Sequence, residues 1–361
     1  MTARRYRGSL VVWALLIAYA SLYPFFPLRL PSSEALVGFL TGPRYMIRSD
    51  IAFNVVAYLP LGMFAALYFR SVGDGRRAIV KAVALGAACS LLMEALQLFV
   101  PNRHVSSIDV AANAFGALVG ALVFRDPVYT LVTRPLAELR ESLVVPGAWG
   151  DAGLVLVMLW LLAQLNPALP FFGAGDIGGA ETRIEIEILQ WTAVAMSICG
   201  FGLFLSALLK PESGTLRVTL VLLSVALWLK FAAAPLMLQP HFRADWVDDA
   251  SVGGLAIGLL ALVALRRLTR PGRIYLGLVF ILAGTLFAKI FGAYSPVEEL
   301  VRLFRWPHGQ VGSFATLTRF LHELWPVAAV VYLSALWVRE RRARAIPAVA
   351  GDAVAPGARE S

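Results

Sequence analysis

The sequence predicts an all-α fold, a polytopic transmembrane helix bundle of about ten helices with both termini in the cytoplasm. Composition is the first observation behind this prediction. Hydrophobic residues make up 59% of the 361 residues and charged residues only 15%, and the mean hydropathy is +0.72. Because a soluble core of this size cannot bury so much apolar surface, the composition excludes an ordinary soluble protein.

The length of the apolar runs is the second observation. A helix needs about 20 apolar residues to cross a bilayer core about 30 Å thick, and ten runs of about this length recur along the chain. The fourth and the eighth are short and rich in glycine. The ten runs lie near residues 8–27, 51–69, 78–100, 108–124, 151–172, 188–209, 216–238, 250–266, 274–293 and 323–338.

The distribution of Lys and Arg predicts the orientation, because cytoplasmic loops retain positive charge. With the N-terminus inside, the predicted cytoplasmic segments hold 21 of the 32 Lys and Arg residues, the opposite side holds nine, and Lys230 and Lys289 fall within helices. This bias requires an even number of helices. It also explains the net charge of +9 through topology and contacts with lipid headgroups, so no nucleic-acid partner is expected.

The first apolar run has a second interpretation, a cleaved signal peptide. Arginines precede it, and residues 18–20 resemble a small-x-small cleavage site. Because the apolar run continues past this site to Phe26, the sequence favours a retained first helix. An external segment of roughly residues 28–49 then leads to the second helix.

The second helix begins at a candidate N-cap, Ser49-Asp50. Asp50 and Asn54 lie four residues apart and therefore share one face of its outer end. Pro60, two residues before Gly62, removes a backbone donor and predicts a kink. Because lipid tolerates such a defect only where neighbouring groups satisfy it, the kink is expected to face protein.

The third helix carries a carboxylate, Glu94, on one stripe with Ser90 and Gln97. An ionised side chain at a helix centre costs roughly 2.5 to 3.5 kcal/mol on insertion scales. We therefore expect Glu94 to be paired, protonated or facing a cavity.

The fourth helix runs back inward, with Ser107 as a candidate cap and Asp109 in its first turn, where a negative charge suits the helix dipole. Its polar stripe continues through Asn113, Gly116 and Gly120. Because the spacing Gly-x-x-x-Gly lets another helix approach closely, this stripe is expected to face protein and not lipid.

The polar residues of helices two to four all fall at the predicted outer end of the bundle. The loop after the third helix adds Asn102, Arg103 and His104. We therefore predict one polar cluster with a helix kink and close packing beside it. Its members are Asp50, Asn54, Glu94, Gln97, Arg103, Asp109 and Asn113, and the kink and packing residues are Pro60, Gly62, Gly116 and Gly120.

These residues form a pattern of spaced elements. In order, they are Asp50-x3-Asn54, Pro60-Leu61-Gly62, Glu94-x2-Gln97-x3-Pro101-x-Arg103 and Asp109-x3-Asn113-x2-Gly116. The pattern resembles that of the VanZ-like family of bacterial membrane proteins over about residues 10–125. The resemblance implies a four-helix module of the bacterial cytoplasmic (inner) membrane, named for a protein linked to resistance against the glycopeptide teicoplanin. It implies no catalytic residue, because the family has no established biochemical mechanism.

The rest of the chain partly repeats the first module. Gly254 and Gly258 repeat the spacing of Gly116 and Gly120, although the acidic and amide motifs are lost, which indicates a degenerate scaffold copy. The predicted units are a VanZ-like module at 1–125, a cytoplasmic linker with room for an interfacial helix at 126–150, the second four-helix copy at 151–266, two further membrane helices with an external loop at 267–345, and a disordered tail at 346–361.

The two intramembrane lysines, Lys230 and Lys289, each have two interpretations. One is a counter-ion for Glu94 or for an anionic ligand group, and the other is snorkelling toward an interface. Cys89 and Cys199 show no metal or redox spacing, so we expect no disulfide, no metal and no cofactor.

Three functional hypotheses remain open at this point. The cluster binds or moves an anionic lipid or a lipid-linked envelope precursor at the outer leaflet, with Arg103 on phosphate and with Glu94 and Asp109 coupled to protons. Alternatively, its interhelical hydrogen bonds only hold the bundle together. The third hypothesis is an acid and base pair, Glu94 and Asp109, acting on a lipid-linked substrate. Membrane lipids are the expected partners, and the sequence identifies no protein partner.

Overall fold

Helices account for most of the described residues in the computed structural model. The described residues are 2–23, 25–31, 37, 48–75, 77–100, 105–123, 126–169, 171–172, 184–240, 249–291, 302–305 and 310–345. They form eleven α-helices and one short 3-10 helix, with two isolated bridges and no β-strand among the described residues. The prediction of an all-α helical bundle is therefore confirmed.

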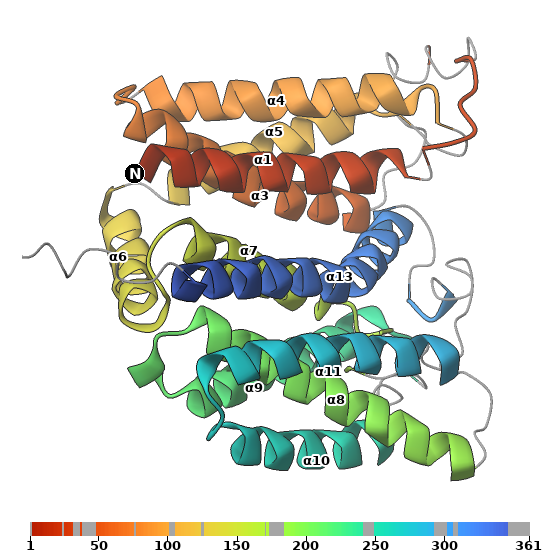
Figure 1. The fold of residues 1–361 in the computed structure, drawn as a ribbon. Coiled ribbons are helices and arrows are strands. Elements are labelled where there is room, and N and C mark those ends of the chain that lie inside the picture. The colour runs from red at the N-terminus through yellow and green to blue at the C-terminus, as the bar shows by residue number, and fades with distance from the viewer. Residues whose placement is uncertain are drawn as a thin grey trace, which may run out of the picture.

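Four N-terminal helices pack together along one edge of the bundle (Figure 1). They are α1 (Thr2–Leu22), α3 (Arg48–Ser71), α4 (Arg77–Gln97) and α5 (Ser107–Val123). The contact between α3 and α5 is the most extensive of this group, and α4 packs on both of these helices. The helix α1 packs on α3 and more lightly on α4. The pair α3 and α5 is therefore the centre of this layer.

The other long helices form the middle and the opposite edge of the bundle (Figure 1). They are α7 (Ala148–Ala163), α8 (Ile184–Leu208), α9 (Thr215–Met237), α10 (Asp249–Leu265), α11 (Arg270–Phe291) and α13 (Gln310–Ala345). The helix α8 packs against α10 and α11, with its Phe201 and Phe204 completely buried. The helix α13 contacts α7 and α11 as well as α1 and α3, so it joins the two edges.

Membrane crossing follows from the lengths of these helices. Each of the ten predicted runs overlaps one helix, and α6 (Asp126–Leu143) is an additional helix that lies across one end of the bundle (Figure 1). Six of the described helices are long and apolar enough to cross a membrane, while α1, α5, α7 and α10 have shorter apolar segments. The start of α1 and the end of α13 lie at the same end of the bundle (Figure 1). A total of ten spans and a cytoplasmic location of both termini stay predictions.

The last helix is longer than predicted. The sequence predicts a helix at 323–338 after an external loop, whereas α13 begins at Gln310 and ends at Ala345. The prediction was wrong at the start of the helix because Arg319, with Thr316 and Thr318, lowers the local hydropathy of the first turns. The buried hydroxyls of the two threonines donate to the carbonyls of Gly312 and Phe314, at 2.8 and 2.7 Å, so the helix itself satisfies them.

Three glycines place α3 and α5 in backbone contact. A Cβ atom at Gly120 would collide with the Leu59 carbonyl oxygen and lie 2.9 Å from its carbon. A Cβ at Gly116 would collide with the Val55 carbonyl in the same way, and one at Gly62 would collide with the backbone of Ala117. Because real Cβ atoms do not approach backbone so closely, only glycine fits at these positions without moving the two helices apart.

The helix α3 continues through Pro60, which cannot donate to the carbonyl of Val56. The next carbonyl, that of Ala57, accepts a hydrogen bond of 2.8 Å from the indole Nε1 of Trp13 on α1. A side chain of a neighbouring helix therefore bonds the α3 backbone one residue after the carbonyl that Pro60 leaves without its helical donor.

We expect Trp13→Phe to lower the free energy of unfolding by about 1 kcal/mol, because phenylalanine keeps an aromatic ring but loses the N–H donor. The measurement is the unfolding midpoint of the purified protein in a mild detergent. Trp228→Phe is the matched control, because the Trp228 side chain on α9 is 66% exposed. Equal midpoints for the two variants would contradict the role given to the Trp13 hydrogen bond.

The second copy predicted at 151–266 stays a prediction. A Cβ at Gly254 would lie 2.5 Å from the Val194 side chain, and one at Gly258 would lie 2.8 Å from the Ala195 carbonyl oxygen, so these α10 glycines pack on α8. This contact resembles that of the α5 glycines with α3. However, α9 packs only lightly on α8, whereas α4 packs on both α3 and α5. The likeness of the two units is therefore limited to one helix pair.

Candidate functional site

Glu94 connects the end of α4 to the start of α5. Its side chain is 5% exposed, and Oε2 accepts a hydrogen bond of 2.8 Å from the backbone N–H of Ser106. The Ser106 hydroxyl in turn accepts from the Ile108 N–H at 3.2 Å, so Ser106 is the N-cap of α5. The cap thus lies one residue before Ser107, the predicted position. The carboxylate also lies at the positive end of the α5 dipole, which favours its burial there.

A second polar contact lies one helical turn from Glu94. The Asn113 amide Nδ2 on α5 donates to the Ser90 hydroxyl on α4 at 2.8 Å, and both side chains are buried. Tyr58 of α3, 3% exposed, lies beside Ser90. The Tyr58 hydroxyl and the Asn113 Oδ1 make no hydrogen bond of standard length and angle with the described residues. The three helices therefore bring more polar atoms together here than their mutual hydrogen bonds use.

Gln97 faces α1. Its Nε2 donates to the carbonyl oxygen of Ser21, at the end of α1, at 2.9 Å. Two residues later the Phe99 carbonyl accepts a 2.8 Å hydrogen bond from the Arg29 N–H. Together these bonds fix the end of α4 to the chain that leaves α1.

Asp109 lies at the accessible part of the cluster. It is in the first turn of α5, and Asp50 is in the first turn of α3. Both side chains are half-buried, and their negative charges lie near each other. Asn54 is 8% exposed and interacts with Asp109, although its buried Nδ2 makes no hydrogen bond of standard geometry. Like charges repel, so this pair is most stable with a proton or a hydrogen-bond donor between the two carboxylates.

The structure describes six of the seven predicted cluster residues. Asp50, Asn54 and Asp109 meet at one end of α3 and α5, Glu94 lies next to them, and Asn113 is one turn deeper on α5. Arg103 lies outside the described residues, as do Asn102 and His104. The sequence did not predict Tyr58 or Ser106 as members. Tyr58 follows Asn54 by four residues and therefore shares its face of α3, so helical spacing could have predicted it as a member.

The chemistry of the described cluster is that of carboxylates, amides and hydroxyls. These groups accept hydrogen bonds from hydroxyl and ammonium donors and exchange protons. No group of three or more His, Cys, Asp or Glu side chains in the described part of the chain is arranged to hold a metal ion.

Lys230 lies outside this cluster and is completely buried in α9. Its ammonium Nζ donates to the carbonyl oxygens of Asn166 and Leu169, which follow α7, at 2.8 and 2.7 Å. Asn166 is also fully buried and donates from Nδ2 to the Thr318 hydroxyl of α13 at 2.9 Å. Lys230 therefore does not snorkel, because it connects three parts of the second half. Lys289, by contrast, forms a partly exposed ion pair with Glu323 at 3.3 Å.

Fold and site together define a class: a membrane protein of bundled apolar helices, with a polar cluster built from the helices α3, α4 and α5. Residues 9–132 match the family model described as VanZ/LLP1. This segment matches the VanZ-like family and includes α3, α4 and α5 in full and most of α1. Neither the curated proteins nor the solved structures contain a match to this chain.

Proposed function

We propose that the VanZ-like module binds the headgroup of an anionic lipid or a lipid-linked envelope precursor at the outer leaflet of the bacterial cytoplasmic membrane. The observation that carries the proposal is the pair of half-buried carboxylates, Asp50 and Asp109, beside the buried amide of Asn54. Internal hydrogen bonds alone do not need two like charges at one position. A ligand that donates hydrogen bonds accounts for both.

We assign two roles to the cluster residues: a frame that holds the helices together and a binding face that contacts the ligand. Glu94, Gln97 and Asn113 are buried and bond neighbouring parts of the bundle together, so they form the frame, whereas the half-buried Asp50 and Asp109 form the binding face. Asp50 and Asp109 accept hydrogen bonds from hydroxyl or ammonium groups of the headgroup. Arg103 binds its phosphate, because a guanidinium forms bidentate hydrogen bonds with phosphate oxygens.

The location of the site follows from the proposed topology. With ten spans and both termini in the cytoplasm, the end of α4 and the starts of α3 and α5 lie at the outer leaflet. Altered display or movement of an envelope precursor there would change the target of a glycopeptide such as teicoplanin. Protection against that antibiotic is therefore the cellular role that we propose.

A purely structural scaffold is the second candidate, and specific hydrogen bonds favour it. The Glu94 carboxylate holds the start of α5, and Asn113 holds Ser90. Interhelical hydrogen bonds of this kind average about 0.6 kcal/mol in membrane proteins, so several of them stabilise a bundle modestly. A scaffold can use the charge of Asp109 at the start of α5, but it gains nothing from the second negative charge of Asp50 beside it.

The two candidates differ in what they predict for Asp109→Asn. This change keeps size and hydrogen bonding but removes the charge, so ligand binding predicts a loss of function in a folded protein, and a scaffold predicts normal function. The measurement is glycopeptide susceptibility together with the envelope lipid profile, for wild type, a deletion strain and the variant. A deletion strain with wild-type susceptibility and lipids would contradict the proposal.

Two substitutions of Glu94 test its role in the frame separately from ligand binding. Glu94→Gln keeps an oxygen acceptor for the Ser106 N–H and is expected to retain function. Glu94→Leu leaves that buried N–H without a partner, which costs about 1 to 3 kcal/mol, and is expected to lower the amount of folded protein. Normal folding of Glu94→Leu would contradict the frame role of Glu94.

A further inference from the structure

The C-terminal half of α13 combines an apolar stripe with arginines at its end. Val331, Ala335, Val338 and Arg342 follow one another at spacings of four, three and four residues, so they share one face of the helix. Val331 is 64% exposed and Val338 is 42% exposed. This face therefore remains open along its length.

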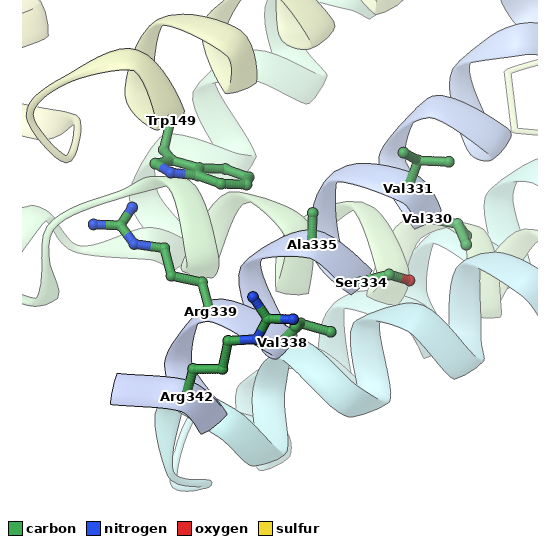
Figure 2. Close-up of a pocket in the computed structure, with 8 residues that line it drawn as sticks. All are labelled: Trp149, Val330, Val331, Ser334, Ala335, Val338, Arg339 and Arg342. Carbon is green, nitrogen blue, oxygen red and sulfur yellow. The ribbon is translucent and has the colours of Figure 1, made fainter. Parts of the chain in front are cut away.

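A groove runs along this stripe (Figure 2). Its volume is about 690 Å³, and it is open along one side. Trp149, at the start of α7, and Arg339 form its far wall, with the guanidinium 5.6 Å from the centre of the indole ring (Figure 2). The Tyr332 hydroxyl of α13 donates to the Trp149 carbonyl oxygen at 3.1 Å, which fixes this wall to the helix. The groove is therefore formed jointly by α7 and α13.

The charge of the groove lies at one end and is positive. Neither Arg339 nor Arg342 forms an ion pair with any residue that the structure describes. The nearby carboxylate of Glu340 pairs with Arg270 at 2.9 Å. Arg341 points elsewhere and stacks on the Trp337 ring at 4.0 Å. Two arginines therefore face the groove with their charge available to a ligand.

The length of the stripe matches one leaflet. Eleven residues separate Val331 from Arg342, which is about 16 Å at 1.5 Å per residue. Half of a bilayer core of about 30 Å is about 15 Å. An acyl chain that lies on the valines consequently places its headgroup beside the arginines.

We propose that this groove binds an anionic phospholipid, with one acyl chain along Val331, Ala335 and Val338 and the phosphate between Arg339 and Arg342. Guanidinium groups bind phosphate in bidentate geometry, and basic pockets between membrane helices are the known setting for anionic headgroups. The site lies at the end of the bundle where α1 begins and α13 ends (Figure 1). It is separate from the Asp50 and Asp109 cluster and does not depend on the function proposed for that cluster.

The test uses the full-length protein, purified in detergent and supplied with equal amounts of phosphatidylglycerol and phosphatidylcholine. Native mass spectrometry then counts the lipids retained by each chain. We expect one phosphatidylglycerol to be preferred in the wild type, and the double variant Arg339→Gln/Arg342→Gln to reduce this preference at least about tenfold. Ala335→Trp fills the groove without changing the charge and is expected to remove the same lipid.

The matched control is Arg266→Gln/Arg267→Gln, which removes the same charge from an exposed turn after α10 and is expected to keep the preference. Unfolding midpoints establish that each variant is folded. An unchanged preference in the groove variants, or an equal loss in the control, would overturn the proposal. A phosphatidylglycerol preference that Ala335→Trp leaves unchanged would also overturn it, because the acyl chain would then have no role in the groove.

Discussion

Replacing Gly120 with alanine is expected to disrupt the VanZ-like module strongly. The new Cβ would collide with the Leu59 carbonyl oxygen and would lie 3.0 Å from the Met63 backbone nitrogen. These atoms belong to the backbone of α3, so no side-chain rotation relieves the clash. The two helices have to separate, and we expect a loss of about 3 kcal/mol or more in the free energy of unfolding.

Gly8→Ala is the matched control for this prediction. Gly8 also lies within a helix, α1, but a Cβ there would meet no atom within 4 Å. Alanine stabilises an exposed helix position by roughly 0.5 to 1 kcal/mol relative to glycine, so this variant is expected to be at least as stable as wild type. Unfolding midpoints in a mild detergent measure both effects. A Gly120→Ala midpoint equal to that of Gly8→Ala would show that α3 and α5 are not in backbone contact.

Lys230→Met is expected to have the largest effect in the second half of the bundle. Methionine keeps most of the unbranched stem but leaves the carbonyl oxygens of Asn166 and Leu169 without their donor. Each buried carbonyl without a partner costs about 1 to 3 kcal/mol, and part of this loss is offset because an ammonium no longer has to be buried. We therefore expect a net loss of about 2 to 4 kcal/mol.

The same substitution at Lys289 provides the comparison. Lys289 is in α11, and its ion pair with Glu323 is partly exposed, with side-chain exposures of 45% and 40%. Exposed ion pairs contribute about 0 to 1 kcal/mol, so Lys289→Met is expected to change the unfolding midpoint little. If the two variants unfolded alike, the ammonium of Lys230 would not be holding the segment that follows α7.

The helices were predictable from the sequence because a membrane span is a long apolar run, and every predicted run overlaps a helix. The start of α13 was not predictable in this way, since Arg319, Thr316 and Thr318 reduce hydropathy there, although the threonine hydroxyls bond within their own helix. Hydropathy depends only on which residues a segment contains. It does not show whether their polar groups form hydrogen bonds within the helix.

The candidate site was partly predictable for a related reason. Helical spacing places Asp50 with Asn54, and Asp109 with Asn113, on shared faces. It does not show that Glu94 bonds the backbone of Ser106, because that contact depends on how the chain turns between α4 and α5. The partners of Lys230 were unpredictable too, since they lie more than 60 residues away along the chain.

Direct measurement of bound lipid tests the central claim that the carboxylates of the VanZ-like module contact a headgroup. Lipids retained by the purified protein are identified by mass spectrometry in wild type, in Asp50→Asn/Asp109→Asn, and in Glu138→Gln, a control on the exposed face of α6. We predict one lipid or lipid-linked precursor that the wild type and the control retain and that the double variant loses while staying folded. Identical lipids in all three proteins would contradict the claim.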